Sequence, residues 1–362
     1  MPPLEVWEKV FLDDAEEMRS THLKVGCMIC HRGDSSTMDK SAAHEGLIID
    51  PSETSCNTCH SEIAHNNESN LHTTLSGFEN ALLTRGANLA AGSPASEAFK
   101  NHCQTCHTTC GQCHVSKPDA MGGGLVSGHE FKNPPSMKNN CVACHGSRVG
   151  AEYLGTNTGV PGDLHWTKNG MSCSDCHRTE IHGAGEVATN RYHTSSQVEC
   201  IDCHEAVLDK SVSNAHHRLH TEILSCQVCH SVDYKGCYNC HVEVSEQGTC
   251  YFTSDPSVMQ FEVGFNPITS PERPYKYVVL RHVPTNPDLF ASYGANLLPN
   301  FNALPTWKYA TPHNIQLKTP QNDGCNYCHG QEQLFLLPSD VTPQELEANK
   351  SVIVYELPGM GE

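Results

Sequence analysis

The stretch CQTCHTTCGQCH, residues 103–114, places four cysteines and two histidines within twelve positions. It holds two copies of the pattern Cys-x-x-Cys-His, beginning at Cys103 and Cys110, with only Thr108 and Thr109 between them. Gly and Pro are frequent in the chain, and only 38% of its residues are hydrophobic and 7% aromatic. This composition predicts that something other than an ordinary apolar core organises the fold.

The same pattern occurs ten times along the 362 residues and accounts for all but one of the 21 cysteines. The motif cysteines are Cys27, Cys30, Cys56, Cys59, Cys103, Cys106, Cys110, Cys113, Cys141, Cys144, Cys173, Cys176, Cys200, Cys203, Cys226, Cys229, Cys237, Cys240, Cys325 and Cys328. The motif histidines are His31, His60, His107, His114, His145, His177, His204, His230, His241 and His329. Because every pair of cysteines is followed by a histidine, the explanation has to give all three residues a role.

Three kinds of chemistry use closely spaced cysteines. A disulfide framework explains an even number of cysteines in a small secreted chain, but it gives no role to the histidines. Tetrahedral zinc binds Cys-x-x-Cys thiolates, but pairs of motifs sharing one metal would again leave the histidines unused. Covalent attachment of a c-type haem uses all three residues, since two thiols add to the porphyrin vinyl groups and the imidazole binds the iron. The pattern therefore predicts ten haem c groups.

Through these ten motifs, residues 27–329 resemble the multihaem c-type cytochromes. The resemblance implies a short polypeptide wrapped around its haems and a function in electron transfer. Its partners would be other redox proteins, further copies of the chain in a filament, and periplasmic or extracellular electron acceptors. In this family haem is attached outside the cytoplasm, which implies a periplasmic, secreted or cell-surface protein. The first residues, MPPLEVWEKVFLDDAEE, lack the basic start and apolar run of a signal peptide, so we expect a processed or truncated chain.

The formal net charge is −18 with neutral histidines. Imidazoles bound to iron cannot take a second proton, so we expect the protein to be strongly acidic. An acidic protein is repelled by phosphate backbones, and this excludes nucleic acid as a partner. No stretch approaches the roughly 20 apolar residues of a membrane-spanning helix, so no transmembrane segment is expected.

The spacing of the motifs predicts four regions and a mostly irregular fold with short α-helices. Residues 1–75 form an N-terminal region with two haems, and 76–100 a haem-free connector with an Ala/Leu-rich helical half and a Gly-Ser-Pro break. Residues 101–245 form a core with seven haems, and 246–362 a C-terminal region with one. In the last region β-branched and aromatic residues alternate with polar ones, which predicts a small β element near 255–285.

The chemistry of each haem depends on the ligand opposite the motif histidine. A second histidine leaves the iron saturated and able only to pass electrons, whereas an open position admits a substrate. Fourteen histidines lie outside the motifs, and His217 and His220 share a helical face from which they can reach two neighbouring haems. Our candidates for the opposite ligand are His22, His44, His72, His129, His165, His182, His217, His220, His282 and His313. His65, His102, His193 and His216 rank lower.

These observations predict an electron-transfer protein with mostly bis-histidine haems and no catalytic residue. The alternative is a multihaem reductase that acts on a nitrogen or sulfur oxyanion at one open haem. Families of that kind often replace a motif histidine by lysine, whereas every motif here keeps histidine. Cys250 lies outside the motifs and is a candidate for a buried free thiol, a link to another chain or a reactive residue, of which burial is the commonest fate of a free cysteine.

Overall fold

The computed structural model describes residues 4–9, 20–192, 198–211, 214–237 and 239–359. The chain divides into two compact units, each built from three separate stretches. The six-motif unit comprises Met1–Gly77, Cys103–Gly146 and Ser172–Gln197, and the four-motif unit comprises Phe78–His102, Ser147–Met171 and Val198–Glu362. The four regions predicted from the motif spacing are continuous ranges that differ in the density of motifs. The two compact units are instead defined by contacts in space, so the two divisions describe different properties.

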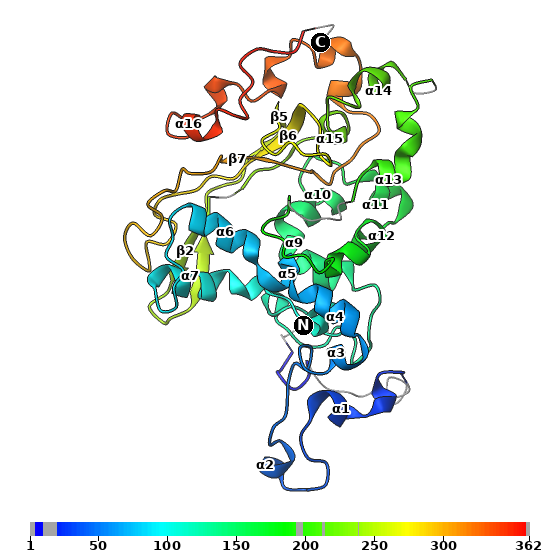
Figure 1. Cartoon of the computed structure of the whole chain (residues 1–362), viewed down its shortest axis with the longest axis vertical. Helices are drawn as coiled ribbons and strands as arrows, with labels where there is room; N and C mark the ends of the chain where they lie inside the picture. The colour runs from blue at the N-terminus through cyan, green and yellow to red at the C-terminus, as the bar shows by residue number, and fades with distance from the viewer. Residues whose placement is uncertain (1–3, 10–19, 193–197, 212–213, 238, 360–362) are drawn as a thin grey trace. The chain divides into compact units, whose positions relative to one another are not determined.

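Short helices and turns make up the regular structure described in the six-motif unit (Figure 1). The α-helices are α1 (Cys27–His31), α2 (Lys40–Ala43), α3 (Cys56–Cys59), α4 (Ser61–Glu68), α5 (Leu71–Thr74), α8 (Cys110–His114), α9 (Val142–His145) and α12 (Cys173–Cys176). The 3₁₀ and π turns are η2 (Leu23–Val25), η3 (Gln104–Cys106), η4 (Asp119–Met121), η5 (Met137–Cys141) and η7 (Thr179–His182). Helices of one or two turns are not stable alone, so other contacts must hold them.

Apolar packing within the polypeptide is sparse in the six-motif unit. Among its described residues, Leu75 and Ala188 are the buried apolar side chains. Apolar residues inside the first motif face outward instead, with Met28 45% and Ile29 65% exposed. The polypeptide of this unit therefore does not build a core of its own from apolar side chains.

The four-motif unit contains both helices and strands. Its helices are α7 (Pro94–His102), α10 (Ala151–Leu154), α11 (Leu164–Asn169), α13 (Ile201–His204), α14 (Ala215–His220), α15 (Cys226–His230) and α16 (Leu346–Asn349), with 3₁₀ turns η8 (Glu205–Leu208), η9 (Pro320–Asn322), η10 (Cys325–Tyr327), η11 (Glu332–Leu334) and η12 (Pro338–Asp340). Helix α6 (Ser76–Thr84) and the π turn η6 (Gly146–Gly150) begin where stretches of the six-motif unit end. The connector is helical in its first half, as predicted, and Pro94 then begins α7 at a position that favours proline.

All described strands belong to the four-motif unit and pair antiparallel. They are β1 (Tyr234–Lys235), β2 (His241–Val244), β3 (Cys250–Thr253), β4 (Met259–Gln260), β5 (Glu262–Phe265), β6 (Tyr277–His282) and β7 (Trp307–Tyr309), paired as β1-β4, β2-β3 and β5-β6-β7. The β element predicted near 255–285 is thus present, mainly as the β5-β6 hairpin with Val263 opposite Val279. Short helices and small antiparallel sheets confirm the coarse fold prediction, and in the described ranges no helix is long and apolar enough to cross a membrane.

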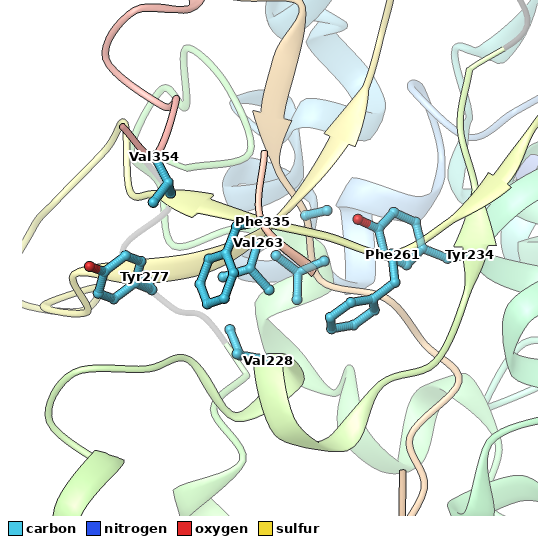
Figure 2. Packing of buried hydrophobic residues seen from close by; sticks show 9 residues of the cluster. Val228, Tyr234, Phe261, Val263, Tyr277, Phe335 and Val354 are labelled. Atoms are coloured by element: carbon cyan, nitrogen blue, oxygen red, sulfur yellow. The ribbon is translucent and has the colours of Figure 1, made fainter. Parts of the chain in front are cut away.

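The apolar core of the four-motif unit forms around this sheet (Figure 2). The rings of Tyr277 and Phe335 meet edge to face with centroids 6.2 Å apart, and Val263 lies beside Phe335. Val354 and Val228 join the same cluster. Because Val228 belongs to α15, which is itself a Cys-x-x-Cys-His motif, the core fixes one motif directly to the sheet.

Candidate metal centres

The motif residues lie mostly on single helical turns. In α1, α8 and α15 the whole motif is one turn, and residues three and four apart on a helix project from the same side. At α8, Thr109 Oγ1 accepts a hydrogen bond from the Gln112 main-chain N–H at 3.2 Å, and Gln112 Oε1 accepts one from Thr109 N–H at 3.3 Å. All 21 cysteines lie in the described ranges, and none forms a disulfide. These three motifs therefore present two free thiols and an imidazole on one side of a turn.

Among the described residues, seven motif histidines each face a histidine from outside the motifs, with ring centroids 6.0–6.2 Å apart. With the motif histidine second, the pairs are His22–His60, His129–His31, His72–His145, His182–His114, His165–His204, His217–His230 and His220–His329. The interplanar angle varies from 9° to 79°, so the distance is the feature that the pairs share.

This distance fits one metal ion between two imidazoles. A ring nitrogen lies about 1.1 Å from the ring centroid and binds a metal at about 2 Å, so two imidazoles on opposite sides of one metal have centroids about 6.2 Å apart. Two such rings can also rotate about their common axis, which accommodates the range of angles. Rings in direct stacking contact would lie closer, as His22 and Phe131 do at 3.9 Å.

The second nitrogen of several of these rings is held by a main-chain carbonyl. His31 Nδ1 lies 2.7 Å from Ile48 O, and His114 Nδ1 lies 2.7 Å from Lys132 O. The same bond is made by His230 to Gln316 O, His220 to His216 O and His329 to Pro358 O, at 3.0, 2.9 and 3.3 Å. A carbonyl only accepts, so Nδ1 carries the proton and Nε2 keeps the lone pair that binds a metal.

Burial favours the neutral form of His72, which is the form that binds metals. Burial, followed by the nearby His145, His177 and His182, lowers the pKa of His72 to about 4. Burial and then His60 lower the pKa of His22 as well.

Two of our candidate ligands are placed differently from these pairs. His44 is exposed, and its Nδ1 donates to Lys40 O at 2.6 Å. His282 stacks on Trp307 with centroids 4.8 Å apart, and its Nε2 lies 3.1 Å from Glu345 Oε1. Both side chains thus have contacts that do not involve a motif histidine.

The remaining histidines have varied surroundings. His313 Nδ1 donates to Thr311 O at 2.8 Å, and His241 begins strand β2. His107 follows η3, and His177 lies close enough to His72 to lower the pKa of that ring. Of the lower-ranked residues, His65 Nδ1 lies 3.9 Å from Glu68 Oε2, and His102 Nε2 lies 3.0 Å from the Tyr293 hydroxyl. The ring centroids of His216 and His220 are 6.3 Å apart, and His193 lies outside the described residues.

Two residues that the sequence reasoning missed hold paired imidazoles in the same way. Asn70 caps α5, and its Oδ1 accepts from the His72 main-chain N–H at 2.7 Å and from His72 Nδ1 at 3.1 Å. Asp163 caps α11, and its Oδ1 accepts from the main-chain N–H and Nδ1 of His165, both at 2.8 Å. The repeated patterns Asn-Leu-His and Asp-Leu-His were the signal that identifies them.

Thiols of different motifs lie beside one another. The thiol pairs that hydrogen bond are Cys56–Cys110, Cys106–Cys144, Cys141–Cys173 and Cys200–Cys226. Further pairs interact electrostatically, among them Cys30–Cys56, Cys113–Cys141, Cys113–Cys144 and Cys229–Cys328. In the first pair the hydrogen bond raises the pKa of Cys56 and lowers that of Cys110 to about 7. Every pair lies within one of the two units.

Cys250 is exposed on β3, so the expectation of a buried thiol was wrong. Its Sγ lies 3.9 Å from the Tyr293 hydroxyl, at the edge of the β2-β3 hairpin where side chains face solvent. In the described part of the chain, no group of three or more His, Cys, Asp or Glu residues is arranged to hold a metal ion, so each imidazole pair offers two protein ligands. Neither a family model, nor a curated protein, nor a solved structure matches the chain.

Proposed function

We propose that this chain is a decahaem c-type cytochrome that transfers electrons outside the cytoplasm. The observation that carries the proposal is the set of seven imidazole pairs, in which a motif histidine faces a non-motif histidine 6.0–6.2 Å away. An isolated pair offers only two ligands, and a porphyrin supplies the four others that a six-coordinate iron needs.

The donor set of each motif also fits a haem. Two free thiols on one side of a turn suit covalent attachment, and the neighbouring imidazole suits the iron. The scarcity of buried apolar side chains in the six-motif unit, together with exposed Met28 and Ile29, fits a polypeptide that packs on flat apolar groups rather than on itself. When bound, each haem supplies a one-electron couple.

The residues of the chain set the spacing and the orientation of these centres. Nδ1 bonds to Ile48, Lys132 and Gln316 carbonyls hold the rings so that Nε2 faces its partner. With histidine on both sides, the coordination hardly changes between redox states, so little reorganisation accompanies electron transfer. This arrangement suits a conductor rather than a substrate site.

From the interactions between thiols of different motifs, we propose an order for the centres within each unit. In the six-motif unit they connect the motifs beginning at Cys27, Cys56, Cys110 and Cys141 in a row. The Cys141 motif also contacts those at Cys103 and Cys173, so we propose that it is a branch point. In the four-motif unit the row runs through the motifs at Cys200, Cys226 and Cys325. Both motifs of CQTCHTTCGQCH thus border the same third motif.

The partners we propose are other redox proteins, further copies of the chain and electron acceptors in the periplasm or outside the cell. The net charge of −18 favours partners with a basic surface, because opposite charge accelerates encounter. This steering weakens as ionic strength rises.

Carbon monoxide added to the reduced protein tests this function. We expect the seven haems whose motif histidine faces a second histidine to be low-spin before reduction and not to bind carbon monoxide afterwards, because two imidazoles hold each of them. A single high-spin haem that binds carbon monoxide would contradict a pure carrier and support the multihaem reductase. Electron microscopy of the same sample separates monomers from filaments.

A further inference from the structure

The centre formed by His165 and His204 differs from the others in the charge of the group that holds its non-motif imidazole. His165 Nδ1 donates to a carboxylate, Asp163, at 2.8 Å. The other rings with a described Nδ1 bond in these pairs donate to neutral oxygens, which are main-chain carbonyls or the amide of Asn70.

Asp163 is buried and fixed in place. It is 2% exposed, and its second oxygen, Oδ2, accepts from the Ile315 main-chain N–H at 3.0 Å. Its own N–H donates to Tyr153 O at 3.0 Å, where the chain doubles back so closely that a Cβ on Gly155 would lie 2.6 Å from Gly162 N. In the described structure its side-chain partners are three N–H groups, none of them from a lysine or arginine.

From this arrangement, and resting on the proposed haem function, we infer that Asp163 is a positioning residue that makes the His165–His204 centre the most reducing of the seven described pairs. A buried anion on Nδ1 increases the electron donation of the imidazole and stabilises the extra positive charge of the oxidised iron. Asp163 itself is buried, so solvent screens its charge only weakly. The reduction potential of this centre therefore lies below that of its neighbours.

The sequence around the paired motif strengthens the same effect. The stretch ECIDCHE, residues 199–205, carries three acidic residues, whereas NCVACHG, residues 140–146, carries none. The second stretch contains His145, whose partner His72 is held by the neutral Asn70. The two centres thus share the same side-chain bond to Nδ1 and differ in the charge of the group that makes it.

Reciprocal substitutions test the inference. D163N keeps the size of the side chain and an oxygen for the His165 ring, but removes the anion. We expect one haem at the low-potential end of a redox titration to shift upward, with at least a tenfold change in its ratio of oxidised to reduced form, which is 59 mV for a one-electron couple. N70D should shift a different haem downward. D39N is the control, since Asp39 caps α2 through the Ala42 N–H at 2.9 Å and none of its described hydrogen bonds is to an imidazole.

The outcomes separate this inference from the proposed function. An absence of covalent haem in the parent protein would overturn both. The inference alone is wrong if the parent carries ten haems and D163N does not change the low-potential end of the redox titration. This conclusion requires that D163N keeps its full haem content and an unchanged circular dichroism spectrum. N70D places a carboxylate beside Ile181 O, which accepts a hydrogen bond from Asn70 in the parent, so this variant risks unfolding. The test therefore has a second measurement that does not depend on N70D, the electron paramagnetic resonance spectrum of oxidised D163N. We expect one low-spin signal to change, and an unaltered spectrum would overturn the role of Asp163.

Discussion

Helix α14 allows one prediction in which a single turn of chain contains both the test and its control. The ring centroid of His217 lies 6.2 Å from that of His230, and the ring centroid of His220 lies 6.0 Å from that of His329. His216 is on the same helix, but its near neighbour is His220 rather than a motif histidine. We therefore expect His217 and His220 each to bind the iron of one haem, and His216 to bind none.

Alanine at either paired position opens one axial site. After reduction we expect H217A and H220A each to bind one carbon monoxide per chain more than the parent and the double variant to bind two more, whereas H216A binds no more than the parent. Each single variant should change about one-tenth of the haem absorbance, because one motif of ten is affected. Titration with carbon monoxide, followed by visible absorption, gives the stoichiometry.

The control decides the interpretation. Carbon monoxide binding by H216A equal to that of H217A would show that disturbing α14 is enough to open a haem. If H217A and H220A keep all ten haems and bind no more carbon monoxide than the parent, then these two imidazoles are not iron ligands and the pairing is incorrect.

Three further predictions concern stability and attachment. Burial, and then Asp340, raise the pKa of Glu262 from 4.5 to about 7, so the folded protein keeps a proton that the unfolded chain releases, and stability falls as pH rises through this window. With allowance for partial exposure, E262Q should be more stable than the parent by about 1–2 kcal/mol at pH 8 and equal to it at pH 4, as measured by denaturant unfolding at both pH values. L280A removes a fully buried side chain of β6 and should cost about 2–5 kcal/mol by the same assay, whereas L83A, at a position on α6 that is 52% exposed, should stay within about 0.5 kcal/mol; equal losses would contradict the core described around the sheet. C250S should retain every haem and C226S/C229S should lose one by mass spectrometry, and a haem lost in C250S would give that exposed thiol a role in attachment.

The sequence allowed the coarse fold to be predicted and the ten Cys-x-x-Cys-His motifs to be recognised, because both depend on local patterns. A Cys-x-x-Cys-His motif is complete within five residues, and the alternation in 258–290 already indicates the β5-β6 hairpin. The third strand, β7, escaped prediction because three residues are too short for an alternation to be seen.

Pairing between histidines could not be read from the sequence, because it depends on the path of the chain. His31 and His129 are brought together from distant positions, and no local pattern encodes that separation. His282 illustrates a second difficulty. An apolar neighbourhood suggested a porphyrin, but Trp307 also provides a flat apolar face, and the ring stacks there.

Intact mass under denaturing conditions tests the central claim most directly. Protein produced in a host that attaches haem c is unfolded and weighed with and without reductant. We predict the mass of the polypeptide plus ten haems in both cases, since thioether bonds survive unfolding and reduction. A mass equal to the bare polypeptide, or one that falls to it when metal is removed by a chelator, would contradict the account and return the ten motifs to thiolate metal binding.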